Sequence, residues 1–134
     1  MGRVFFNTRK NVHTLKAAYT VLASDSGKVF MINSAGGAFN VTLPTSLEDG
    51  LMYKFISVDT TADVQILSTT DIIDIVGLDS ETDAGFSSAG TAKGKIILEA
   101  AGHKSQYVNL YCDGTSWYGE GMASVDDGIT VAAA

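Results

Sequence analysis

Short apolar runs recur along most of this chain, and glycine, aspartate, asparagine and serine residues separate them. Runs rich in β-branched and aromatic residues and bounded by turn formers are typical of β-strands. Within residues 39–43 and 106–112, apolar side chains alternate with polar or tyrosine side chains. Because successive side chains of a strand point to opposite faces, this alternation predicts half-buried strands, which fit an antiparallel sheet better than a parallel one.

About ten strands are predicted in this way. They span residues 19–22, 28–33, 39–43, 51–58, 64–67, 72–76, 95–100, 106–112, 116–122 and 129–131. Helices are poorly supported, because the windows 11–19 and 46–51 are short and lack a sustained 3.6-residue period. The pair Asp113-Gly114 stands between two strong runs and predicts a hairpin. The expected fold is an all-β antiparallel sandwich.

Two segments lack this alternation. Residues 1–18 are interpreted as an extended, basic N-terminal arm, and residues 79–94 as a long loop at one end of the sandwich. Residues 19–134 then form a single β-sandwich domain. A chain of 134 residues is long enough to bury a core without the help of a disulfide or a metal.

Charged residues are sparse. They make up 18% of the chain, and hydrophobic residues make up 46%, whereas about 25% charged residues is typical of soluble domains. This composition favours a domain that covers part of its surface with another protein or with copies of itself. The alternative is that many small residues inflate the hydropathy.

The charges are also unevenly distributed. The first 16 residues carry four of the nine basic residues and no acidic residue, whereas the rest of the chain carries all fifteen acidic residues. An acidic body argues against nucleic acid as a partner, because phosphate contacts need a basic footprint. A basic arm suits docking onto an acidic protein surface. A solvated chain terminus is the alternative interpretation of the arm.

Features of secretion and membrane insertion are missing from the sequence. The only cysteine is Cys112, so no internal disulfide can form. The first residues, MGRVFFNTRKN, lack the apolar core of about 7–15 residues that a signal peptide needs. No apolar stretch approaches the roughly 18 residues that cross a bilayer. We therefore expect synthesis in a cytosol-like compartment and no contact with a membrane.

The residue types that carry most enzyme chemistry are few and far apart. His13 and His103 are separated by 90 positions, and neither has a metal-ligand spacing such as HExxH. Cys112 shares its strand face with Val108 and Leu110, which predicts a buried, inert thiol rather than a nucleophile. Neither GxxxxGK[ST] nor GxGxxG occurs. We expect no cofactor, no metal and no enzymatic activity.

Two clusters leave alternatives open. The densest acidic cluster comprises Asp71, Asp74, Asp79, Glu81 and Asp83. It is either a solvated loop or a Ca²⁺ site, although its spacing does not match an EF-hand. An aromatic group comprises Tyr107, Tyr111, Trp117 and Tyr118. These rings either pack in the core and in interfaces or form a platform for carbohydrate.

Several strings along the chain resemble a pattern found in small bacteriophage structural proteins. Residues 19–44, YTVLASDSGKVFMINSAGGAFNVTLP, combine a strand, an SDSGK turn, an apolar strand, a glycine-rich turn and a strand that ends in VTLP. A glycine precedes the long run 51–56, DGTSWYGEG follows at 113–121, and GIT follows at 128–130. Together the strings span about residues 19–131, so residues 1–18 lie outside the resemblance.

The resemblance implies a capsid decoration (cement) protein: a jelly-roll-like sandwich, usually trimeric, that binds the outer surface of a viral shell. The expected partners are other copies of the chain and the major capsid protein, and the expected location is the virion. We predict that the arm grips the capsid, with apolar anchors from two phenylalanines and ion pairs from three basic residues. These residues are Arg3, Phe5, Phe6, Arg9 and Lys10.

Two other functions are weighed against this one. The resemblance also extends to head-fibre and tail-fibre domains, which implies a host-recognition module that binds glycans. A metal-dependent lyase or hydrolase on a jelly roll needs clustered histidines and a carboxylate. The two distant histidines of this chain disfavour the enzyme.

Overall fold

The computed structural model describes residues 11–82 and 85–134. Twelve strands and one short 3-10 turn, Ala23–Asp25, make up the regular structure of these residues. The strands form two sheets that pack face to face, so the prediction of an all-β sandwich is confirmed.

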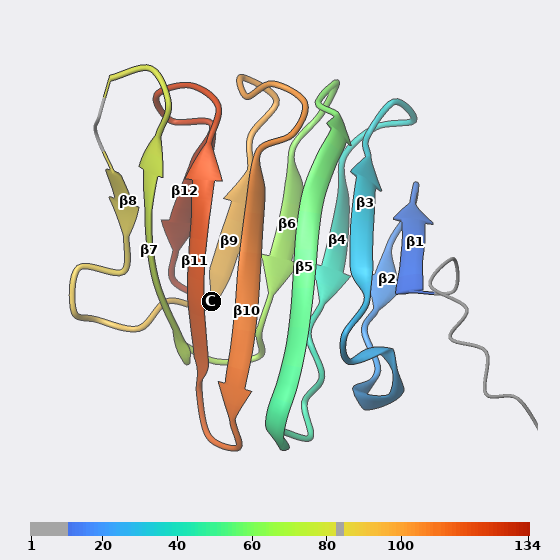
Figure 1. Ribbon diagram of the computed structural model, residues 1–134, viewed down its shortest axis with the longest axis vertical. Coiled ribbons are helices and arrows are strands. Elements are labelled where there is room, and N and C mark those ends of the chain that lie inside the picture. The colour runs from blue at the N-terminus through green and yellow to red at the C-terminus, as the bar shows by residue number, and fades with distance from the viewer. Residues whose placement is uncertain (1–10, 83–84) are drawn as a thin grey trace, which may run out of the picture.

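The front sheet in Figure 1 has seven strands and the rear sheet has five. In spatial order the front sheet contains β1 (Val12–Leu15), β3 (Val29–Asn33), β5 (Asp49–Asp59), β10 (Tyr107–Asp113), β11 (Trp117–Ala123), β7 (Ile73–Asp79) and β8 (Gly85–Ser87). The rear sheet contains β12 (Ile129–Ala132), β9 (Lys95–Leu98), β6 (Val64–Leu67), β4 (Phe39–Thr42) and β2 (Tyr19–Thr20).

From β1 to β6 the chain crosses between the sheets at every connection (Figure 1). Strands β1, β3 and β5 therefore lie parallel in the front sheet, and β2, β4 and β6 lie parallel in the rear sheet. With the parallel pair β11–β7, five of the ten strand pairs among the described residues are parallel.

The expectation of antiparallel sheets is therefore wrong for half of the pairs, and a jelly-roll order is not confirmed. Alternation of apolar and polar side chains indicates that one face of a strand is buried, but it contains no information on the direction of the neighbouring strand. A strand that returns to its sheet after one passage through the other sheet runs in its former direction.

Aromatic and aliphatic side chains from both sheets fill the space between them. Phe30 stacks on Phe55 with ring centroids 5.4 Å apart, and Tyr53 packs against Trp117 at 5.7 Å. The alternation predicted for residues 39–43 and 106–112 is confirmed, because their apolar members face this core. Cys112 lies among them as a buried free thiol, as predicted.

Two short strands lie where no strand was expected. Strand β1 pairs with β3 and buries Leu15, so the predicted arm boundary at residue 18 is too far along the chain. Strand β8 pairs with β7 inside the predicted loop 79–94 and buries Phe86. Each strand is too short to produce a periodic pattern, and pairing with a longer neighbour fixes its conformation.

The predicted hairpin at Asp113-Gly114 is confirmed, and it joins β10 to β11. Gly114 has φ +91°, a backbone conformation that favours glycine. The Asp113 carboxylate accepts hydrogen bonds from the Ser116 amide at 2.8 Å and from the Thr115 amide and hydroxyl at 2.9 Å. These bonds lower the pKa of Asp113 to about 2.

The free energy of unfolding is expected to fall in acid, because the Asp113 carboxylate of this turn becomes protonated. The pKa of Asp113 drops from an ordinary 3.8 to about 2 on folding, so its contribution is complete above 3.8 and disappears as the pH falls toward 2. Asp113→Asn keeps an oxygen that accepts the same bonds but cannot titrate. The difference in unfolding free energy between wild type and variant, measured with urea, should narrow from pH about 5 to about 2.5. A difference in unfolding free energy that does not change with pH would contradict the stabilising role of the Asp113 carboxylate.

Candidate interaction surface

Strands β5, β10, β11 and β7 carry three rows of side chains on the side of the front sheet that faces away from the core. In the middle row Lys54, Asn109, Glu120 and Val76 are consecutive register partners. Each alternates along its strand with residues that face the core. Figure 1 views the sheet from this side.

The two flanking rows are mostly apolar. One row consists of Ile56, Tyr107, Met122 and Leu78. The other consists of Met52, Tyr111, Tyr118 and Asp74. These three rows are called the outer face below. Register pairing extends the outer face onto β3 through Val29 and Met31.

Large apolar side chains are exposed mainly on the outer face. Of the eight exposed large hydrophobic residues among those described, six belong to its three rows. Val76 is 64% exposed and Leu78 is 53% exposed, and the other four are Met52, Tyr111, Tyr118 and Met122. Exposed apolar side chains gathered on one side of a sheet make this side a candidate interaction surface.

The corresponding side of the rear sheet has a different composition. Its outward positions are Thr20, Thr42, Leu67, Lys95 and Ala132 in one row, and Asn40, Gln65, Ile97 and Thr130 in the next. Hydroxyl, amide and charged groups predominate there. The exposed side of the rear sheet is therefore more polar than the outer face.

Two charged side chains of the middle row are held by tyrosines of β10. The Lys54 ammonium lies 4.6 Å from the centre of the Tyr107 ring. On the other side of β10, the Tyr111 hydroxyl donates to the Glu120 carboxylate at 3.2 Å. The pKa of Tyr111 is raised. Burial is the largest cause, and this hydrogen bond is the next. Among residues 11–82 and 85–134 the single ion pair is Lys28–Asp25, so neither Lys54 nor Glu120 has an oppositely charged partner there.

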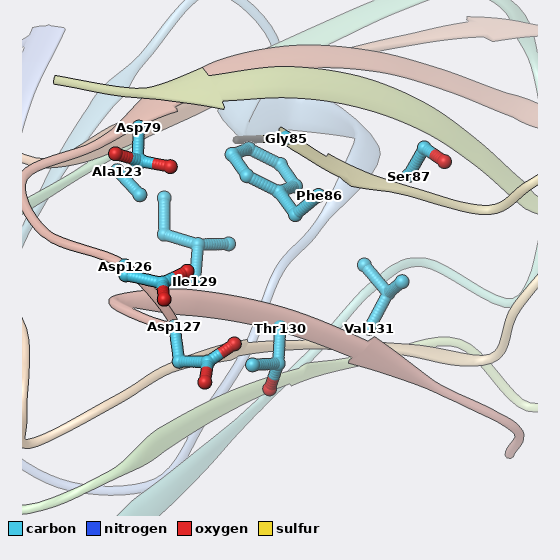
Figure 2. Close-up of a pocket in the computed structure, with 10 residues that line it drawn as sticks. All are labelled: Asp79, Gly85, Phe86, Ser87, Ala123, Asp126, Asp127, Ile129, Thr130 and Val131. Atoms are coloured by element: carbon cyan, nitrogen blue, oxygen red, sulfur yellow. The ribbon is translucent and has the colours of Figure 1, made fainter. Parts of the chain in front are cut away.

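A pocket of about 230 Å³ opens at the edge of the sandwich between β8 and β12. Phe86 and Ile129 reach into it from opposite sheets, and Asp79, Asp126 and Asp127 lie at one end (Figure 2). The Asp79 carboxylate already accepts bonds from the amides of residues 81 and 82. In the part of the chain that the structure describes, no group of three or more His, Cys, Asp or Glu side chains could hold a metal ion.

A buried carboxylate closes one end of the sandwich. Asp25 accepts bonds from Lys28 Nζ at 2.6 Å, from the Tyr19 hydroxyl at 2.9 Å and from the Leu22 amide at 3.0 Å. Burial alone would raise the pKa of Asp25, but these bonds outweigh it and lower the pKa. Tyr53 donates to the Leu22 carbonyl beside it at 2.8 Å. Every oxygen of this cluster is engaged within the chain, so the cluster serves stability.

The structure describes some of the residues that the sequence analysis singled out and leaves others outside the described ranges. Arg3, Phe5, Phe6, Arg9 and Lys10, predicted to grip a capsid, lie outside the described residues. His13 packs against Tyr19 and Phe30 with ring centroids 5.3 and 5.9 Å away, and His103 lies exposed in a turn. Within the acidic cluster, Asp83 also lies outside the described residues.

The aromatic group divides between the two sides of the front sheet. Trp117 is fully buried, so it cannot stack on a sugar. Tyr107, Tyr111 and Tyr118 belong to the outer face. The outer face as a whole was missed in the sequence. A signal was present in Met52-Tyr53-Lys54-Phe55-Ile56, where both sets of alternating positions are rich in apolar residues, as expected for a strand covered on two sides.

No protein-family model and no curated protein matches this chain. In the residues that the structure describes, no helix is long and apolar enough to span a membrane. The outer face is the feature of the described residues on which a functional proposal rests.

Proposed function

We propose that this chain is a virion structural protein: a decoration protein that binds the outer surface of a capsid as a homotrimer and stabilises the shell. The observation that carries the proposal is the apolar outer face of an otherwise acidic domain. Exposed apolar side chains gathered on one face of a domain are typical of a surface that binds another protein. The resemblance to phage structural proteins supplies the capsid as the setting.

The proposed mechanism is mechanical. Each bound oligomer bridges neighbouring capsid subunits, so their separation requires the decoration contacts to break as well as the contacts of the shell. Many copies of modest affinity act together, because each bound module raises the effective concentration of the next. The arm supplies contacts to the major capsid protein, with Phe5 and Phe6 as apolar anchors and Arg3, Arg9 and Lys10 as partners for acidic side chains.

The role of the arm is tested by deletion of residues 2–10, which stops short of Val12 and leaves β1 intact. The truncated protein should keep its circular dichroism spectrum and its oligomeric state. Its affinity for capsids that lack the protein should fall at least about tenfold, because the deletion removes all five proposed anchor residues and a tenfold change corresponds to only about 1.4 kcal/mol. Co-sedimentation with capsids measures the change.

A matched control separates the arm from general charge effects. Lys93→Ala with Lys104→Ala removes two basic residues from the body, and Arg9→Ala with Lys10→Ala removes two from the arm. Only the arm variant should weaken capsid binding. Full binding by the truncated protein would refute the proposed role of the arm. Specific glycan binding that is lost in Tyr118→Ala, in a protein without affinity for capsids, would instead favour host recognition.

A further inference from the structure

Two charged residues in the middle row of the outer face are placed symmetrically about β10. Asn109 is the register partner of Lys54 on one side and of Glu120 on the other. Neighbouring strands lie about 4.8 Å apart, so the two charged residues stand roughly 10 Å apart across β10. That separation is too large for an ion pair between them, and each is instead held by a tyrosine of β10.

We propose that the outer face is a contact between copies of this chain, in which Lys54 of one copy pairs with Glu120 of the next. A two-fold axis along β10 brings the β5 side of each copy opposite the β11 side of the other, which places Lys54 opposite Glu120 twice.

The apolar positions obey the same symmetry. Val76 lies two strands from β10 on one side, and Val29 lies two strands from it on the other, in the same row. In the flanking row Met122 and Ile56 are related in the same way about Tyr107. In these two rows an exchange of the two sides therefore places apolar side chains against apolar ones and Lys54 against Glu120. A surface that complements itself is the requirement for a two-fold contact between identical subunits.

The charge of the rest of the molecule supports a second copy as the occupant. The chain has a net charge of −6, and residues 17–134 contain all fifteen acidic residues. On the three rows of the outer face, however, the charged residues are one lysine, Lys54, and two acids, Glu120 and Asp74. The outer face thus carries little net charge, so two acidic copies can approach through it without strong local repulsion.

This inference rests on the proposed self-association of the chain. A two-fold contact joins copies in pairs, so it lies between trimers and not within one, and the assembly measured below is this pairing. Light scattering coupled to size exclusion, on the full chain, tests it through charge reversal. Lys54→Glu and Glu120→Lys should each weaken assembly at least about tenfold, because like charges then meet at the contact. The double variant Lys54→Glu/Glu120→Lys should restore it. Lys95→Glu, on the outward side of the rear sheet, is the matched control and should assemble like the wild type.

Each outcome has one meaning. Loss of assembly in both single variants with recovery in the double variant supports the pairing. Assembly that persists in both single variants, or a double variant as weak as the singles, overturns it while the oligomer itself stands. A wild-type chain that is monomeric at every concentration overturns the self-assembly on which the inference rests, and capsid binding is then judged by co-sedimentation alone. Circular dichroism confirms that each variant is folded.

Discussion

Replacement of Trp117 by alanine is expected to lower the free energy of unfolding by about 3–5 kcal/mol. Trp117 is the only tryptophan, is fully buried, and packs against Tyr53 with ring centroids 5.7 Å apart. Its removal leaves a large cavity between the sheets at the first residue of β11, where rigid strands cannot collapse to fill it. Urea unfolding followed by circular dichroism measures the loss. A change below about 1 kcal/mol would show that the site is not part of the core.

Trp117→Phe is the control for this experiment. The indole Nε1 of Trp117 is buried and has no hydrogen-bond partner in the described structure. Phenylalanine keeps most of the ring and removes the unpaired donor, so it should cost clearly less than alanine. A phenylalanine variant as unstable as the alanine variant would mean that Nε1 has a partner after all.

Replacement of Gly77 by alanine is the second change with a large expected effect, a loss of about 3 kcal/mol at the upper end of overpacking costs. A Cβ at this position would lie 2.2 Å from Phe86 Cζ and 2.5 Å from the Gly121 carbonyl oxygen. The ring could rotate away, but the backbone oxygen belongs to the paired strand β11 and cannot move without disrupting the sheet. Strand β8, which depends on Phe86, should lose protection from amide exchange first.

Gly36→Ala is the matched control. A Cβ at Gly36 would meet nothing within 4 Å, and its backbone lies outside the positive-φ region that strains other residues. The same chemical change should therefore shift the unfolding free energy by no more than about 0.5 kcal/mol. Equal effects at Gly36 and Gly77 would show that the cost comes from the loss of glycine itself rather than from the contact with Phe86 and β11.

The sequence predicted those parts of the fold that are determined by residues close together in the chain. Alternation in residues 39–43 and 106–112 identified their buried faces, and Asp113-Gly114 identified the hairpin, because these signals are local. Strand direction was not predictable, since it depends on which sheet the chain visits between two strands. Strands β1 and β8 were missed for a related reason: their conformation is imposed by pairing with β3 and β7.

The candidate interaction surface was only partly predictable. The low proportion of charged residues predicted a covered surface, but composition cannot say which side of which strand would form it. That assignment needed the register that aligns Lys54, Asn109 and Glu120 across three strands. These residues lie 11 to 66 positions apart in the chain, so no local pattern brings them together.

The alternating path of β1 to β6 also determines the order in which the molecule can fold. In the hairpin, Cys112 meets Trp117 only five residues later, whereas Val29 meets Lys54 after 25 residues and Phe55 meets Val108 after 53. Contacts between distant residues form slowly, because a long loop must close before they are made. On the ribosome the first half of the chain emerges before β10, the central strand to which β5 docks. We therefore infer that the last-synthesised hairpin completes the front sheet, and that a nascent chain stays vulnerable to aggregation until that hairpin has emerged.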